Sequence, residues 1–172
     1  MIGADAAAAP LGAGEAAFRG YRLTPVYLCI TDAERAEVIA MWRDANALRN
    51  LDVAEQRSRE VVLLVRHAAS GVLAGVSTVG LKPRPADGRL LYHYRMFVRP
   101  EHRQPHLMRA VTNATRDYLR DFRHPDAEPA GMLIVTENRK LMRPGLKRLL
   151  GRHGYEYRGR ERRGLDVWLV RF

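Results

Sequence analysis

A segment near the middle of the chain joins the end of a predicted strand to the start of a predicted helix. The apolar strand ends at Val98, Pro100 interrupts it, and a helical pattern begins at Leu107. The first turn of a helix presents backbone N–H groups without intrahelical partners and the positive end of the helix dipole. Four cationic side chains lie around this helix start: Arg99, His102, Arg103 and Arg109. The combination predicts a binding site for the phosphate groups of a ligand.

The histidines and the cysteine do not form a metal-binding pattern. His102 and His106 are four residues apart but separated by Pro105, and the other histidines follow at irregular intervals. Cys29 is the only cysteine, which excludes an intrachain disulfide and a zinc cluster of the cysteine type. Because it lies in an apolar run, we expect it to be a small core residue in a reducing, intracellular compartment. We therefore expect no bound metal.

The apolar patterns predict which elements position this segment. Thr31 and Glu34 form a capping box that begins a helix, which we expect to reach about Leu48. The stretch 82–88 is predicted to be a loop, because proline lacks the backbone donor that a central strand needs. The expected strands are 21–30, 61–65, 72–81, 89–98, 131–136, 155–160 and 165–172, and the other expected helices are 52–59, 107–122 and 141–150. This order predicts an α/β (α+β) fold, with a mixed, mostly antiparallel central sheet of six to seven strands flanked by about four helices.

Composition favours one globular domain. The chain has 172 residues, 47% hydrophobic and 28% charged. We assign the domain to residues 21–172 and expect the Ala- and Gly-rich segment 1–20 to be flexible. No apolar run approaches the roughly 20 residues that cross a bilayer, so we expect a cytoplasmic protein without a membrane partner. The formal net charge is +10, and residues 139–172 hold eleven Lys and Arg against three acidic residues, a field that attracts anionic partners.

The segment around the helix start resembles the central motif of the GNAT acyltransferases. In that family a strand ends in Val-x-Pro, and Arg/Gln-x-x-Gly-x-Gly/Ala opens the next helix. Here Val98 and Pro100 end the strand, and Arg103 occupies the basic position. His106 and Met108 stand at the two glycine positions, so the acyl-CoA-binding motif departs from the family pattern.

A second resemblance lies closer to the end of the chain. Asn138 follows a buried strand, and the next helix is followed by Gly154 and Tyr155, as in the family. GNAT enzymes often carry a tyrosine four residues before this glycine, where it protonates the departing CoA thiolate; Leu150 occupies that position here. The resemblance covers most of the chain and implies the GNAT fold.

The resemblance also implies a reaction and a set of donor-binding residues. An acyl group, most simply acetyl, would pass from acetyl-CoA or another acyl-CoA to a primary amine that attacks the thioester directly. The backbone N–H of Val98 would polarise the thioester carbonyl. The implied donor-binding residues are Phe97, Val98, Arg103, Gln104, His106, Leu107, Met108, Arg109 and Asn138.

An amine acceptor must lose a proton, so the reaction needs a base. The resemblance places an acidic base six residues before Val98, where this chain has Tyr92. Its neighbours His93 and Tyr94 are further candidates, and the intrinsic pKa of histidine suits a base best. Tyr92 and Tyr94 share one strand face, whereas His93 points to the other. Glu137, at the end of the following strand, is expected near the acyl site.

Two other functions fit the same sequence. N-acyl synthases that use acyl carrier proteins have related folds, and a basic rim would dock an acidic carrier protein. A non-catalytic module of this fold would bind nucleic acid through its Arg-rich end, with Tyr155, Tyr157 and Trp168 stacking on bases. The amine acceptor could be a small molecule, a protein or an anionic substrate. A homodimer formed through sheet edges is a further expectation of the resemblance.

Overall fold

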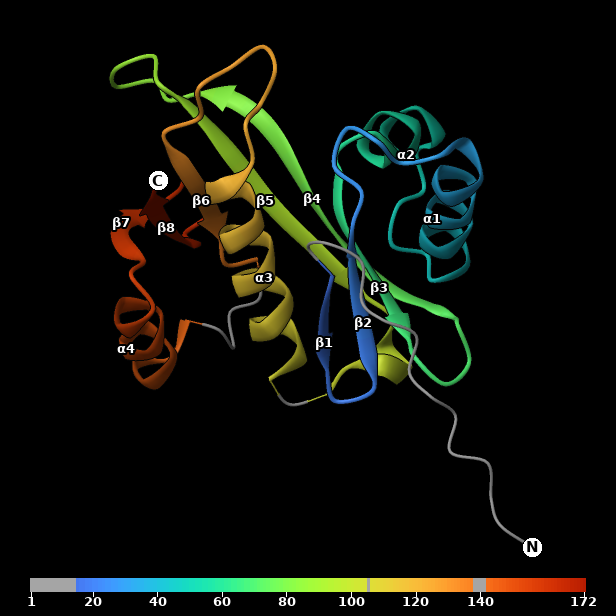
Figure 1. Ribbon diagram of the computed structural model, residues 1–172. Helices are drawn as coiled ribbons and strands as arrows, with labels where there is room; N and C mark the ends of the chain where they lie inside the picture. The colour runs from blue at the N-terminus through green and yellow to red at the C-terminus, as the bar shows by residue number, and fades with distance from the viewer. Residues whose placement is uncertain (1–14, 105, 138–141) are drawn as a thin grey trace, which may run out of the picture.

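A computed structural model describes residues 15–104, 106–137 and 142–172. Eight strands form one sheet in the order β1-β2-β3-β4-β5-β6-β8-β7, in which only the β5–β6 pair is parallel (Figure 1). The strands are β1 (Ala16–Phe18), β2 (Tyr21–Pro25), β3 (Val61–His67), β4 (Leu73–Pro83), β5 (Leu90–Val98), β6 (Gly131–Val135), β7 (Glu156–Arg160) and β8 (Asp166–Arg171). The helices are α1 (Asp32–Asp44), α2 (Leu51–Ser58), the short 3-10 turn η1 (Pro100–His102), α3 (Leu107–Asp121) and α4 (Pro144–Arg152). The predicted α/β architecture is confirmed.

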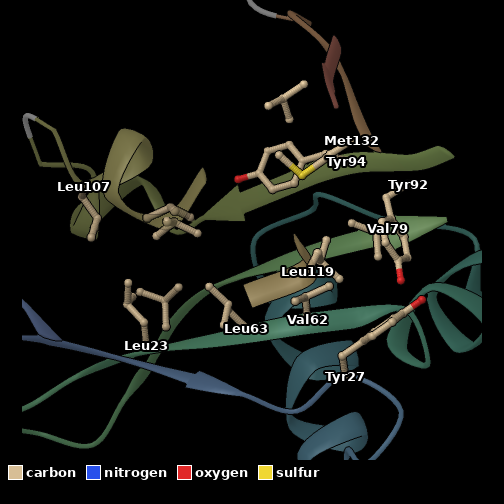
Figure 2. Packing of buried hydrophobic residues seen from close by; sticks show 14 of the residues in the cluster. Leu23, Tyr27, Val62, Leu63, Val79, Tyr92, Tyr94, Leu107, Leu119 and Met132 are labelled. Carbon is tan, nitrogen blue, oxygen red and sulfur yellow. The ribbon is translucent and has the colours of Figure 1, made fainter. Parts of the chain in front are cut away.

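The helices cover both faces of the sheet (Figure 1). On one face α1 and α2 enclose a core that includes Trp42 of α1 and Val76 of β4. On the other face α3 buries Val111 and Leu119 against the sheet, in the larger cluster of Figure 2. Leu150 of α4 packs against this same cluster. The two cores leave the C-terminal ends of β5 and β6 between the two layers.

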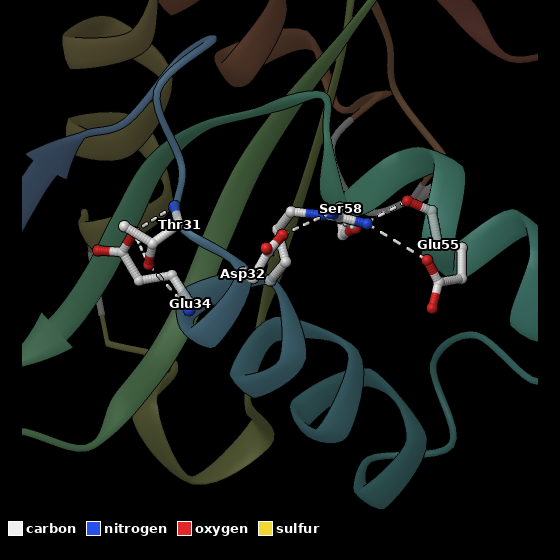
Figure 3. Close-up of polar contacts among 6 residues, drawn as sticks. Thr31, Asp32, Glu34, Glu55 and Ser58 are labelled. Atoms are coloured by element: carbon white, nitrogen blue, oxygen red, sulfur yellow. Dashed lines mark hydrogen bonds and ion pairs between the residues drawn. The ribbon is translucent and has the colours of Figure 1, made fainter.

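Capping groups and one arginine fix the positions of α1 and α2 (Figure 3). The hydroxyl of Thr31 accepts a bond from the backbone N–H of Glu34 at 3.2 Å, and the Glu34 carboxylate accepts from the backbone N–H of Thr31 at 2.9 Å. The predicted capping box is therefore confirmed. Arg35 joins the two helices, because its guanidinium donates to Ser58 and to Glu55 of α2, each at 3.2 Å. This contact holds α2 against α1.

The first expected strand is shorter than the sequence suggests. β2 ends at Pro25, and the chain then turns, with Leu28 at a φ of 61°. Cys29 is exposed in this turn, so its predicted place in the core was wrong. Val26 and Tyr27 are buried, and the N–H of Val26 still donates to the carbonyl of Val62 on β3. The chain leaves the sheet at the turn that follows, in which the N–H of Cys29 donates to the carbonyl of Val26.

The sheet begins earlier in the chain than expected. β1 pairs with β2 through Ala16 and Leu23, and the hairpin turn places Arg19 and Gly20 at φ values of 43° and 81°. Positive φ at both central residues matches the twist of a two-residue hairpin. Residues from Ala16 onward therefore belong to the sheet and not to a flexible segment, which raises the strand count to eight. Residues 1–14 lie outside the described residues.

β4 also continues further than expected. Lys82 and Pro83 remain paired with β5, Pro83 opposite Leu90, although both were predicted to lie in a loop. The pairing of β3 with β4 reaches only to Thr78. Pro83 therefore lies in a part of β4 that has no β3 neighbour. On that side of the strand, no hydrogen bond is lost because proline lacks a backbone N–H.

Candidate functional site

The parallel strands β5 and β6 separate at their C-terminal ends. Their pairing stops at Tyr94 and Ile134. β5 continues to Val98 beside β4, while β6 continues to Val135 beside β8. A wedge therefore opens in the middle of the sheet, with one wall from each strand. We call it the splay.

Backbone groups of β5 face this splay without a strand partner. The N–H of Arg99 donates to the carbonyl of Ala74 on β4 at 2.8 Å. Because the N–H groups of a strand alternate in direction, those of Val98 and Met96 point to the opposite side, into the splay. The carbonyl of Val98 also faces away from β4, since it accepts a bond from Nε of Arg103 at 3.0 Å. The splay thus offers two backbone donors to a ligand.

A glycine holds the end of β5 close to β4. Gly75 lies opposite Val98, and a Cβ at Gly75 would lie 2.5 Å from the carbonyl oxygen of Phe97. Any side chain would push the strands apart at the point where the Val98 amide is oriented. This position therefore requires glycine for close backbone approach.

Two adjoining cavities extend from the splay. The splay pocket, of about 320 Å³, lies between the ends of β5 and β6 and the start of α3. The α3–α4 groove, of about 360 Å³, continues between the two helices and is mostly apolar. The two cavities share the side chains of Met96, Met108, Thr112, Ile134 and Thr136. Because they share these side chains, we treat the two cavities as one channel, in which Val98 lines only the splay pocket.

The start of α3 is open to a ligand. His106 adopts the left-handed conformation with a φ of 68°, and its side chain makes no capping hydrogen bond. The first intrahelical bond runs from Ala110 to His106, so the amides of Met108 and Arg109 precede the helical ladder. His106 stands at the first glycine position of the family motif, and its positive φ shows why glycine suits that place. The exposed side chains of Met108 and Arg109 line the α3–α4 groove.

The three candidates on β5 lie in different surroundings. Tyr92 is 1% exposed and packs edge-on against Tyr27 in the core, where burial raises its pKa well above the usual range (Figure 2). Tyr94 lines the splay pocket, and its hydroxyl bonds the Thr112 hydroxyl at 2.9 Å. His93 points to the other face, toward α1 and α2, as strand alternation predicts. Burial, with the charges of Lys82 and Arg95, lowers the pKa of His93, which favours the neutral imidazole.

The other predicted residues are only partly brought together. Phe97, Val98, Arg103 and Met108 line the splay pocket with Glu137. His106, Met108 and Arg109 line the α3–α4 groove. Leu107 is fully buried, so its side chain belongs to the core. The Gln104 amide lies near the Tyr21 hydroxyl, at 3.4 Å, and lines neither cavity. Asn138 lies outside the described residues.

Several lining residues were not found from the sequence. They carry no local pattern and come from α3, α4 and the residue after β6: Thr112, Asn113, Thr136, Leu146 and Leu149. Tyr155, considered above for base stacking, also lines the groove. Leu150 also lines the groove, where the family often has a tyrosine. Tyr155 is 3% exposed, and its hydroxyl has no hydrogen-bond partner among the described residues. Burial raises the pKa of Tyr155 to about 12.

Carboxylates of the C-terminal hairpin pair with four of its five arginines. Glu156 pairs with Arg158 and Arg171, and Glu161 pairs with Arg163. The remaining carboxylate, Asp166, is fully buried and pairs with Lys147 at 2.8 Å and Arg160 at 3.4 Å. Of the three aromatic residues considered for base stacking, only Tyr157 is exposed, whereas Tyr155 and Trp168 are buried.

Two searches of the described residues found nothing. No group of three or more His, Cys, Asp or Glu side chains among them could hold a metal ion. None of the helices in the described part of the chain is long and apolar enough to span a membrane.

Comparison by sequence finds no matching family model and no matching curated protein. Comparison by structure finds close likeness over nearly the whole chain. The GNAT domain of S. lividans PAT matches 95% of this chain and 100% of its own, with a TM-score of 0.64 and 10% identity. The chain has the GNAT fold.

Other solved structures with this fold agree. The NatC complex bound to Gag peptide and CoA matches 90% of this chain and 99% of its own, with a TM-score of 0.60 and 12% identity. The ribosomal-protein-S5-alanine acetyltransferase from Vibrio fischeri matches 90% and 93%, with a TM-score of 0.57 and 12% identity. The predicted GNAT fold is therefore confirmed, whereas the roles of its residues remain predictions.

Proposed function

We propose that the chain is an acyl-CoA-dependent N-acyltransferase that transfers an acetyl or similar small acyl group to a primary amine. One observation carries this proposal: beyond the last β5–β6 pair, the amide of Val98 has no strand partner among the described residues and faces cavities that adjoin the start of α3. The likeness to GNAT acetyltransferase structures, one of them bound to CoA and a peptide, supports it.

The residues of the channel fit an acyl-CoA. The amides of Met108 and Arg109, with the positive end of α3, would hold the pyrophosphate. The cation of Arg109 would add to this attraction. The mostly apolar α3–α4 groove would take the pantetheine arm, and the splay pocket the thioester. Met108 projects into the channel where the family has glycine, but its unbranched side chain adapts easily to a ligand.

The chemistry needs a polarised carbonyl and a proton acceptor. The Val98 N–H would stabilise the oxyanion as the amine nitrogen attacks the thioester carbon. A C–N bond then forms, the C–S bond breaks, and the thiolate takes a proton from solvent. We assign the amine proton to Glu137, because this carboxylate lines both the splay pocket and a second pocket on the α2 face. Tyr92 has no role in this scheme, since it lies in the core.

One feature of the channel favours a different acyl donor, an acyl carrier protein. His106 and Met108 place side chains where glycines would leave space for a nucleotide pyrophosphate. An acyl carrier protein presents only a phosphopantetheine arm, which needs less room at this end. Its acidic surface would meet exposed cations such as Arg109. The nucleic-acid alternative has less support, because four of the hairpin arginines are paired with carboxylates and two of its three aromatic residues are buried.

Titration calorimetry with acetyl-CoA, and with free CoA as a control, tests the donor at low and moderate salt. Micromolar, saturable binding of acetyl-CoA supports the proposal, and a screen for amine-dependent thiol release then follows. Absence of acetyl-CoA binding overturns the CoA donor. Salt-sensitive binding of an acidic acyl carrier protein in that case would support the second donor.

A further inference from the structure

A small pocket lies on the opposite face of the sheet from α3, beside α2. We call this cavity of about 140 Å³ the α2 pocket. It shares Arg95, Met96, Phe97 and Glu137 with the splay pocket. Its remaining lining comes from α1, the α1–α2 connection, α2 and β4: Trp42, Ala47, Leu48, Arg57, Val76 and Thr78. The two pockets therefore approach the splay from opposite faces of the sheet.

Two arginines converge on the α2 pocket without a partner. Arg57 comes from α2 and Arg95 from the middle of β5. Within the described part of the chain, neither guanidinium lies within 4.0 Å of a carboxylate. Burial, and then the positive charge of Arg95, lower the pKa of Arg57, although the charges of Glu60 and Glu137 act in the opposite direction. The lowering by Arg95 indicates that the two cations lie close enough to repel each other. An anion placed between them would remove this repulsion and could accept bidentate bonds.

The surrounding charged residues indicate how much negative charge that anion carries. Lys82 of β4 also acts on this region, as its charge affects Glu60 and His93. Glu60 lies beside Gly80, at 3.6 Å from the position that a Cβ would take there, and Gly80 pairs with His93. Burial raises the pKa of Glu60, against the lowering effect of the nearby arginines.

Among the residues that line the α2 pocket, two are cations, Arg57 and Arg95, and one is a carboxylate, Glu137, which leaves one positive charge unbalanced. A single carboxylate suits this balance better than a phosphate dianion.

The arrangement also separates the two ends of a ligand. Glu137 lines the splay pocket as well as the α2 pocket, so its carboxylate lies where an amine would approach the thioester. Arg57 lines only the α2 pocket. An amine held near Glu137 would thus carry its anionic group toward the arginines.

We propose that the α2 pocket binds the carboxylate of the acceptor, and that the acceptor is a small amine that also carries a carboxylate, as an amino acid does. This inference rests on the proposed acyl transfer and names its substrate class. It also moves the anion-binding site away from the C-terminal hairpin, where Arg158, Arg160, Arg163 and Arg171 are already paired with carboxylates.

The test compares amino acids with their carboxamides and their decarboxylated amines as acceptors, by thiol release from acetyl-CoA. The amino acids should give a kcat/KM at least about tenfold above that of their neutral analogues. Arg57→Met and Arg95→Met should both abolish this preference through KM. Arg57→Met should also leave the binding of acetyl-CoA unchanged, because Arg57 does not line the splay pocket. Arg59→Met is the matched control, because Arg59 is an exposed arginine that follows α2 and lines no part of the pocket.

Equal use of acids and amides, or equal effects of the arginine variants on both, would overturn the proposal. Direct calorimetry of the amino acids without a donor distinguishes it from a failure of the acyl transfer itself. Binding that Arg57→Met removes and Arg59→Met retains supports the pocket even if acetyl-CoA does not bind. If the folded wild-type protein binds none of the amino acids, the proposal is overturned. Thermal melting checks that the wild-type protein and both variants are folded.

Discussion

Nε of Arg103 donates a hydrogen bond to the carbonyl oxygen of Val98 across 3.0 Å. This bond ties the loop before α3 to the strand end that orients the Val98 amide. The same side chain lines the splay pocket, so its positive charge lies beside the proposed thioester site. Arg103 thus contacts the strand end that orients the Val98 amide and also lines the channel proposed to bind acyl-CoA.

Replacement of Arg103 by Met should weaken acetyl-CoA binding about tenfold, which corresponds to about 1.4 kcal/mol. The expected cause is the loss of both the Val98 contact and the local positive charge. Calorimetry measures the effect. Arg162→Met is the control, because it removes the same charge from the exposed β7–β8 turn. An equal loss in both variants would show that net charge alone attracts the ligand.

Replacement of His106 by Gly should give a more stable protein than replacement by Ala, by about 1 kcal/mol. Both changes remove the imidazole, but only glycine adopts the φ of 68° without strain. The Gly variant should also bind acetyl-CoA more tightly, because it restores the space at the helix start. Urea denaturation and calorimetry check the two effects. Equal stability of the Gly and Ala variants would contradict the strain.

Tyr92→Phe should leave acyl transfer unchanged and should not destabilise the protein. The Tyr92 hydroxyl is buried without a partner among the described residues, so its removal can raise the free energy of unfolding by about 1 kcal/mol. Tyr94→Phe is the contrasting variant, since it breaks the bond to Thr112 and should cost about 1 kcal/mol. Denaturant titration measures both. A large loss of turnover in Tyr92→Phe would restore Tyr92 as a catalytic candidate.

Asp166→Asn should lower the free energy of unfolding by about 3 kcal/mol at neutral pH, because Asp166 is a fully buried partner of Lys147. Burial works to raise the pKa of Asp166, but the bonds from Lys147 and Tyr157 bring it below its ordinary value. Its contribution is therefore complete above the unfolded value of about 4 and is lost as the pH falls through the lower folded pKa.

Thermal melts from pH 7 to pH 2 test this expectation. The wild-type protein should lose stability across the acidic range more steeply than Asp166→Asn. Glu161→Gln is the control, since Glu161 pairs with Arg163 in an exposed turn of the same hairpin and should change stability by less than about 1 kcal/mol. A parallel acid response in wild type and Asp166→Asn would contradict the assigned role of the buried carboxylate.

Elements with strong local signals could be predicted from the sequence. The capping box of Thr31 set the start of α1, and the apolar stripe of α3 set both its ends within one residue. The predictions of strand limits were wrong where pairing with another strand, and not the local sequence, determines the structure. β1 has three residues and forms only because β2 lies beside it. Pro83 stays in a strand only because β3 ends early, which no local pattern reveals.

The candidate site could be predicted only in part. The Val98 to Arg109 segment was found because a single stretch of chain holds it. The α2 pocket joins Arg57 and Arg95, which are far apart in the sequence and belong to a helix and a strand with no shared pattern. The alternation of β5 correctly separated His93 from the two tyrosines, but it could not show which face meets the channel.

The two edges of the sheet affect how the protein behaves at high concentration. β1 offers only three residues to a neighbouring chain. β7 holds three charged residues among its five, and its register is irregular between Tyr157 and Arg160. Short, charged and irregular edges resist the strand addition that leads to fibres. A protein built this way is expected to remain dispersed even though its net charge attracts anions on every side.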